Sequence, residues 1–215
     1  MGAMPRWEHG SEERLKRAAA ELFAEQGFED TSAVQIAKRA RVTTRTFFRY
    51  FPDKEEVLFA DAEMLRAALV QGILTAPDVA EPLRTVTRTL AGFDWASLGP
   101  RETLRRREEM IASTPELLER DLIKQQQMAD GFGSALQERG VGPDTAELAA
   151  RVGIQVFRTA FRQWLAAGDD ADLSKTTETV MSLLATIVPA GAGRTPGGVS
   201  AGDSPGRTRC THPRP

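Results

Sequence analysis

The sequence has very few of the residues that most often catalyse reactions or bind transition metals. Among 215 residues there are one cysteine, Cys210, and two histidines, His9 and His212, all near the ends. A lone cysteine forms no intrachain disulfide, which fits a reducing compartment such as the cytoplasm. Because nucleophilic and zinc chemistry usually depends on His or Cys, we expect no catalytic residue, no metal site and no cofactor.

Long apolar runs and strand patterns are also missing. Every uncharged stretch is shorter than the roughly 18 apolar residues that span a membrane, and the N-terminus has no apolar signal region. Alternation of apolar and polar residues never lasts beyond about four residues, so no β-strand is predicted. We therefore expect a cytoplasmic, all-α protein with no membrane partner.

Apolar residues instead recur at helical spacing along most of the chain. Ser11 is expected to cap the first helix and Gly27 to end it, while Asp53 and Glu56 form a predicted capping box. Proline, glycine and capping residues together divide the chain into about nine helices, expected over residues 11–26, 31–40, 43–51, 53–73, 82–98, 100–113, 115–139, 144–167 and 170–188.

The composition changes along the chain and suggests three parts. Residues 11–56 form one group of short helices, and residues 57–189 form a second group of longer ones. Residues 190–215 are rich in Gly, Pro, Ser, Thr and Arg and have almost no large apolar side chain. Such a segment buries too little surface to offset its ordering entropy, so we expect a disordered tail.

Basic residues are concentrated in one short segment of an otherwise acidic chain. The formal net charge is −2, yet residues 31–54 carry six Lys or Arg against the single acid Asp53. A basic segment of this kind is typical of nucleic-acid binding, although a solvated helix face has the same charge pattern.

Two short helices joined by a tight turn lie within this segment, as in a helix-turn-helix. The second helix is expected to bury Phe47 and Phe51 and to present Arg, Thr and aromatic side chains to DNA. Arg can bind guanine, Thr can reach a base edge, and helix N-termini can bind phosphate. The predicted DNA-binding residues are Thr31, Ser32, Thr43, Thr44, Arg45, Thr46, Phe48, Arg49, Tyr50 and Lys54.

The residues of this region resemble a known family. Residues 12–60 are similar to the N-terminal DNA-binding domain of tetracycline-repressor (TetR) family regulators. The similarity is carried by LFAEQGF at 22–28, TSAVQIA at 31–37, Val42-Thr43, TFFRYF at 46–51 and PDKE at 52–55. It implies a three-helix DNA-binding domain followed by a helical ligand-binding and dimerisation domain.

Three positions depart from the pattern of that family. Arg41 stands where a glycine is usual, and a left-handed backbone there would strain the arginine or change the turn. Phe48 replaces a usual tyrosine and so lacks the hydroxyl that commonly contacts phosphate. Arg45 replaces a small residue and is the predicted base-reading side chain, unless it pairs with an acid of a neighbouring helix.

The resemblance further implies a repressor that binds double-stranded DNA as a homodimer and leaves a near-palindromic operator when a small-molecule effector binds. Dimerisation is expected through the last two helices, about residues 144–188, because both are apolar on more than one face. A wholly buried helix of a monomer would show the same pattern.

Large apolar side chains in the middle helices are expected to line the effector pocket. They are Met64, Phe93, Trp95, Met110, Met128, Phe132, Phe157 and Phe161. Residues 104–165 are similar to a TetR subclass with acyl-CoA-like ligands, which would give Arg105, Arg106 or Arg107 a role with an anionic ligand; a solvated basic face is the alternative. Two other functions remain as alternatives to a transcriptional regulator. The chain could be an all-α enzyme or ligand carrier, or it could be a scaffold that binds an acidic protein.

Overall fold

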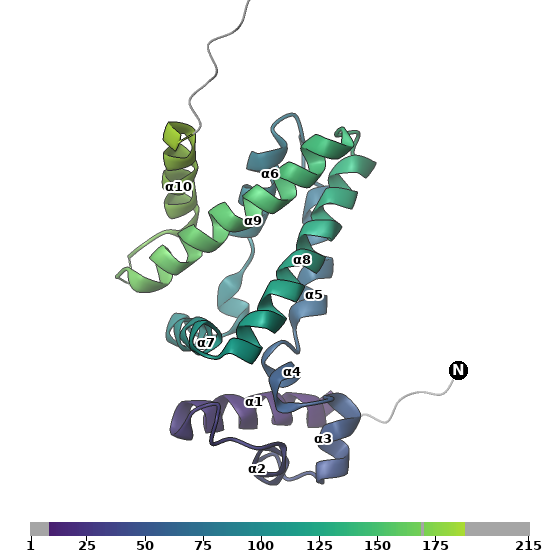
Figure 1. Cartoon of the computed structure of the whole chain (residues 1–215), viewed down its shortest axis with the longest axis vertical. Coiled ribbons are helices and arrows are strands. Elements are labelled where there is room, and N and C mark those ends of the chain that lie inside the picture. Colours follow the sequence, from purple (N-terminus) through teal and green to yellow (C-terminus); the bar gives the residue numbers. More distant parts are fainter. Residues whose placement is uncertain (1–8, 169, 188–215) are drawn as a thin grey trace, which may run out of the picture.

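The computed structural model describes residues 9–168 and 170–187, and within this part every regular element is helical. The expected tail therefore lies outside the described residues. Ten α-helices and one 3-10 helix follow one another along the chain (Figure 1). None of them is long and apolar enough to cross a membrane.

Four helices form one end of the molecule. They are α1 (His9–Gln26), α2 (Ala33–Arg39), α3 (Thr44–Tyr50) and α4 (Lys54–Leu58). The predicted apolar stripe of α1 is buried, and Gly27 ends this helix with φ 84°, as expected. Ser11 does not cap the helix, because α1 begins two residues earlier and the Ser11 hydroxyl accepts a hydrogen bond from Arg14.

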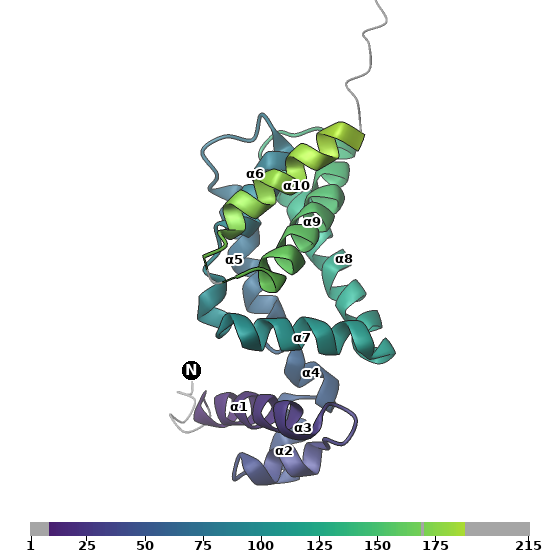
Figure 2. The same ribbon diagram turned by 90° about the vertical axis from the view of Figure 1, so that its left-hand side faces the viewer.

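The larger part of the molecule consists of the remaining helices, which are stacked above this end. They are α5 (Ala62–Leu74), α6 (Pro82–Ala91), η1 (Trp95–Leu98), α7 (Arg101–Ser113), α8 (Pro115–Glu138), α9 (Pro143–Ala166) and α10 (Leu173–Ile187). Figure 2 shows α9 and α10 together on one side of this part. The main apolar core of this larger part lies between α5, α6, α8 and α9.

Two predicted helices are divided in the structure. The helix expected over 53–73 stops at Leu58 and resumes at Ala62, with Phe59 buried at the break. The helix expected over 82–98 ends at Ala91, and the chain continues through Gly92 into the short η1. In contrast, α8 runs without interruption through Gly131 and Gly133.

The two parts share one hydrophobic cluster. Ile111 of α7 and Leu117 of α8 are buried among the side chains of α1 to α4, next to Phe23 and Val57. The core of the end formed by α1 to α4 is therefore completed by residues of the larger part. Because interiors are closely packed, a shift of α7 or α8 is expected to move α4 as well.

Candidate nucleic-acid interface and effector cavity

The helices α2 and α3 form the outermost end of the molecule in both views (Figures 1 and 2). Ser32 caps α2 through a complete capping box with Gln35, and Thr43 caps α3 by accepting a hydrogen bond from the Thr46 amide at 3.0 Å. Phe47 and Phe51 bury the inner face of α3. This arrangement holds α3 on the surface with its outer face toward solvent.

The turn between α2 and α3 keeps the left-handed conformation despite the arginine. Arg41 has φ 57° and is the only non-glycine residue with positive φ in the described chain. The amide of Val42 donates to the Ala37 carbonyl at 3.0 Å, and the amide of Arg41 donates to the Lys38 carbonyl at 3.1 Å. These two bonds make a Schellman motif, in which glycine is the usual residue. The turn is therefore unchanged and the arginine bears the strain.

The outer face of α3 presents Arg45, Phe48 and Arg49, all of which are exposed. Within the described chain, Arg45 makes no hydrogen bond or ion pair, so the predicted alternative of pairing with a neighbouring acid is absent there. Phe48 is 54% exposed and packs edge-on against Phe47. Arg49 donates to the Tyr50 hydroxyl at 3.2 Å and lies over its ring.

Most of the predicted phosphate-binding residues are at the surface around α3. Ser32 is exposed, and Thr44, Thr46 and Tyr50 are half-buried. Thr31 differs, because it is 2% exposed and its hydroxyl donates to the Gly27 carbonyl at 2.7 Å. The Thr31 hydroxyl therefore closes the end of α1. The phosphate site expected at the helix N-terminus formed by Thr31 and Ser32 stays a prediction.

Lys54 already has partners inside the protein. Its ammonium donates to the Phe28 carbonyl at 2.9 Å and lies 4.1 Å from the centroid of the Phe28 ring. This contact joins the start of α4 to the end of α1. Any contact of Lys54 with phosphate would have to share or replace these bonds.

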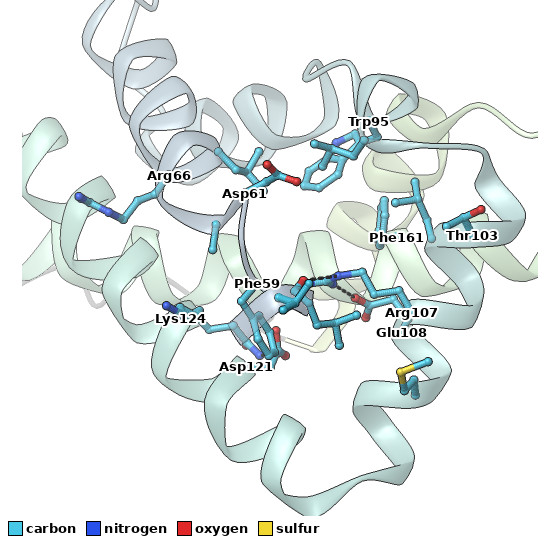
Figure 3. A pocket seen from close by; sticks show the side chains of 18 of the residues that line it. Phe59, Asp61, Arg66, Trp95, Thr103, Arg107, Glu108, Asp121, Lys124 and Phe161 are labelled. Atoms are coloured by element: carbon cyan, nitrogen blue, oxygen red, sulfur yellow. Dashed lines mark hydrogen bonds and ion pairs between the residues drawn. The ribbon is translucent and has the colours of Figure 1, made fainter. Parts of the chain in front are cut away.

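A cavity of about 880 Å³ lies above α1 and α4 and is enclosed mainly by α5, α7, α8 and α9. Figure 3 shows part of its lining, with Trp95 and Phe161 among the aromatic side chains. Trp95 stacks on Phe157 with ring centroids 5.2 Å apart, and the two phenylalanines contact each other. This wall offers an apolar molecule a broad contact surface.

Five of the eight residues predicted to line a pocket do so: Trp95, Met110, Met128, Phe157 and Phe161. The other three do not. Met64 is 55% exposed on the surface, and Phe132 is fully buried in the core. Phe93 supports Trp95 from behind, with ring centroids 5.2 Å apart, but does not reach the cavity.

Charged residues also line the cavity, and of these only Arg106 and Arg107 were expected to have a role with a ligand. Arg158 donates to Asp121 with 3.0 Å between the charged atoms, and Gln125 donates to the same carboxylate at 2.7 Å. Asp61 accepts a hydrogen bond from Lys16 of α1 at 2.8 Å. Arg105 lies outside the cavity and pairs with Glu102.

Two arginines connect this region to the ends of α4. Arg120 of α8 binds Asp53, whose side chain caps α4 by accepting from the Glu56 amide at 2.8 Å. Arg107 of α7 donates to the carbonyl of Leu58, the last residue of α4, at 3.3 Å. The short helix that follows α3 is thus attached to the larger part at both ends.

One further surface is apolar and outward-facing. Leu148 of α9 and Leu183 and Ile187 of α10 are between 53% and 68% exposed. Beneath them, Val156 and Val180 pack in a small cluster that joins the two helices. The α9–α10 side therefore has a buried layer inside and apolar side chains outside.

Comparisons with known proteins agree with this architecture. Residues 15–60 match the family model described as "Bacterial regulatory proteins, tetR family". The HTH-type transcriptional regulator TcmR of Streptomyces glaucescens is 37% identical over 75 residues, which cover 35% of this chain and 33% of the relative. HbdR of Aromatoleum sp. (strain CIB), also an HTH-type transcriptional regulator, is 48% identical over 42 residues, or 20% of this chain and 18% of the relative. The chain covers about half or less of the length of the curated relatives it matches.

Solved structures match nearly the whole fold. FadR of Thermus thermophilus, a TetR family repressor in complex with lauroyl-CoA, has a TM-score of 0.52 and 29% identity, covering 87% of this chain and all of the other. The SmeT–triclosan complex has a TM-score of 0.57 and covers 82% and 90%, and its 20% identity supports the fold alone. The relatives are regulators rather than enzymes. Residues 15–60 are therefore a TetR-family DNA-binding domain, and the helical fold of the described chain as a whole is similar to that of TetR-family transcriptional regulators.

Proposed function

We propose that this chain represses transcription as a homodimer, that α3 reads a near-palindromic operator, and that a small molecule in the cavity releases the DNA. The observation that carries the proposal is the position of Arg45. Its guanidinium is exposed on the outermost helix and has no partner within the described chain. An arginine so placed can donate two hydrogen bonds to O6 and N7 of guanine in the major groove.

The neighbours of Arg45 suit the same role. Phe48 offers an exposed ring that can contact a thymine methyl group, and Arg49 adds a second cation on the same face. Ser32, Thr43 and Tyr50 place hydroxyls around α3 where phosphates would pass. No acidic residue lies on α3, so the whole exposed face is compatible with DNA.

The proposed dimer forms through α9 and α10. Leu148, Leu183 and Ile187 expose apolar surface there, and such a patch favours association. A two-fold axis beside α9 and α10 would place two copies of α3 at one end of the dimer. Each copy would then enter the major groove of one half-site, about 34–36 Å from the other.

Sedimentation of two matched variants tests this interface. Leu183→Glu places a charge in the proposed interface and is expected to give monomers at concentrations at which the wild type is dimeric. Leu122→Glu changes an equally exposed leucine of α8, 55% against 53%, and is expected to leave the dimer intact. Monomers with the second variant but not the first would place the interface on α8.

The effector is proposed to bind in the cavity next to Trp95. The volume of about 880 Å³ is in the range of small-molecule sites. The FadR neighbour binds lauroyl-CoA and the SmeT neighbour binds triclosan, so related folds hold molecules with large apolar portions. Because α4 directly follows α3 and is attached to α7 and α8, an occupied cavity would move α3. A coupling of about 1–3 kcal/mol between the two sites is typical.

Selection of bound sequences from a random DNA pool tests the proposed function. We expect an inverted repeat, retained in gel shifts at near-physiological salt in the presence of competitor DNA. A helical ligand carrier or a scaffold for an acidic protein predicts no enriched sequence. Failure to enrich any sequence with folded, dimeric protein would contradict the proposal.

A further inference from the structure

The basic residues that line the cavity differ in how well they are paired. Six Lys or Arg line it, and five have an acceptor oxygen within 3.0 Å in the described chain. The pairs are Lys16 with Asp61 at 2.8 Å, Arg66 with Glu63 at 3.0 Å, Arg106 with Glu102 at 2.9 Å, Lys124 with Glu56 at 2.8 Å and Arg158 with Asp121 at 3.0 Å. Arg107 is the exception.

The guanidinium of Arg107 has only long contacts. Its Nε and Nη2 atoms each lie 3.3 Å from the Leu58 carbonyl oxygen, and Nη1 lies 3.4 Å from Glu108 (Figure 3). These distances exceed the 2.7–2.9 Å that is usual for charge-assisted bonds. Arg107 therefore has unused capacity to donate hydrogen bonds.

The surroundings of Arg107 make a better acceptor favourable. Burial lowers the pKa of its guanidinium from the ordinary value, while its side chain remains 32% accessible, on a wall of the cavity. Because Arg107 is only partly accessible and its hydrogen bonds are long, an anionic group that enters beside it gains a stronger, charge-assisted interaction.

The acids of the lining nearest to Arg107, Glu108 and Asp121, also have Arg158 as a basic neighbour. Glu108 lies between two guanidiniums, 3.4 Å from Arg107 and 3.9 Å from Arg158. Asp121 is held by Arg158 and Gln125. The lining has six basic and five acidic residues, and two of the cations, Arg106 and Lys124, are paired with the acids Glu102 and Glu56 just outside it. The net charge of the cavity therefore does not select an acid, and the preference rests on the weakly bound guanidinium of Arg107.

Arg107 also touches the carboxyl end of α4. Besides the Leu58 carbonyl, its guanidinium lies 5.3 Å from the ring centroid of Phe59, the residue that follows α4. A ligand group that draws Arg107 toward the cavity would weaken both contacts. The C-terminal end of α4, at the other end of the helix from its cap Asp53, would then be free to move.

We infer that Arg107 is the effector-recognising cation of this cavity and that the effector is an amphipathic molecule with one acidic group. The acidic group replaces the Leu58 carbonyl as the hydrogen-bond acceptor of the guanidinium. The apolar body of the molecule would lie against Trp95, Phe157 and Phe161. This inference rests on the proposed function only in placing the effector in this cavity.

Binding of three straight-chain series tests the recognition. Alkyl carboxylates, alcohols and amines of about six to twelve carbons can be followed by fluorescence of Trp95, with Trp95→Phe to identify the signal. We expect the carboxylates to bind at least about tenfold more tightly than alcohols of equal length. Arg107→Gln should remove this preference, while Arg107→Lys, which keeps the charge, should retain part of it.

Arg106→Gln is the matched control, because Arg106 is the adjacent lining cation but is bound to Glu102. It should leave the carboxylate preference unchanged. An undiminished preference in folded Arg107→Gln, tighter binding of the amines, or no binding of any series by the wild type would overturn the inference.

Hydrogen exchange of the wild type provides a second readout that needs no variant. On binding a carboxylate, the amides of Phe59 and Ala60 at the end of α4 should exchange several-fold faster, while α2 should not change. Unchanged exchange with bound carboxylate would contradict the displacement of Arg107. The selection of operator sequences uses none of these small molecules. A failure of the proposed DNA binding can therefore be told apart from a failure of the inferred ligand recognition.

Discussion

The guanidinium of Arg120 binds both carboxylate oxygens of Asp53, with Nη1–Oδ1 at 3.1 Å and Nη2–Oδ2 at 2.9 Å. Asp53 also caps α4, the helix that follows the proposed recognition helix α3. Arg120 also donates a hydrogen bond to Glu56, and Glu56 in turn accepts one from Lys124 at 2.8 Å. These side chains fix α8 to the start of α4, so the larger part of the molecule directly positions the DNA-binding end.

A double-mutant cycle measures this connection. Asp53→Asn keeps an oxygen that can cap α4 but removes the charge, and Arg120→Gln removes the other partner. Because both side chains are about one-third exposed, we expect a coupling of about 1 kcal/mol in the free energy of unfolding. Additive effects of the two changes in urea unfolding would show that the pair contributes nothing.

Arg41→Gly is expected to stabilise the protein. The left-handed backbone at φ 57° costs an arginine roughly 1–2 kcal/mol, part of which glycine loses again through its flexible unfolded state. We expect a net gain of about 0.5–1 kcal/mol in urea unfolding. Arg41→Ala removes the same charge without relieving the backbone, so it should bring no comparable gain. Equal effects of the two substitutions would show that strain is not the cause.

Gly153→Ala is expected to destabilise the packing of α9 on α6. A Cβ atom at this position would lie 2.6 Å from Cγ1 of Val86, which is fully buried. We expect a loss of about 1–3 kcal/mol in thermal unfolding. Gly133→Ala of α8 is the control, since its nearest contact would be an ordinary 3.9 Å and alanine favours the helix. A stable Gly153→Ala protein would mean that α6 and α9 can separate freely.

Acidification should weaken the attachment of α2 to α1. Hydrogen bonds from Arg39 hold the pKa of Glu25 below its ordinary value of 4.5. A lowered carboxyl pKa stabilises the fold above the unfolded-state pKa, and this contribution is lost as the pH falls through the folded-state pKa. The free energy of unfolding should therefore fall less between pH 6 and pH 3 in Glu25→Gln than in the wild type. The difference between the two proteins should be roughly the contribution of this one ion pair. Identical pH profiles would exclude a role for this pair.

Much of the helical pattern was predictable because local signals and tertiary packing agree. Ser32, Thr43 and Asp53 cap α2, α3 and α4, as their side chains and positions indicate. Gly27 supplies the left-handed residue that ends α1. Each signal acts within a few residues, so the sequence alone contains it.

The divisions within the longer predicted helices depend on packing across the molecule. Residues 53–73 have helical spacing throughout, yet Phe59 turns into the shared core and the helix breaks there. Helical spacing records which residues are apolar but not which core they enter. The same limit explains why Met64 and Phe132 were expected in the cavity and are found elsewhere.

The charged part of the cavity lining was harder to predict than the aromatic part. Asp121 and Arg158 are 37 positions apart and meet only because α8 packs against α9. Large aromatic residues, in contrast, are conspicuous in sequence, and Trp95, Phe157 and Phe161 share one wall. Pairing of distant charges requires the fold, because residue type alone gives no partner.

Base reading by Arg45 is the central part of the proposed function, and one comparison tests it directly. The affinities of the wild type, Arg45→Ala and Lys54→Ala are measured for the selected operator and for random DNA over a range of salt concentrations. Arg45→Ala should lose roughly 1–3 kcal/mol of operator affinity and little affinity for random DNA, whereas Lys54→Ala should weaken both alike. Equal losses on both DNAs for Arg45→Ala would contradict the assignment of α3 as the helix that reads sequence through this residue.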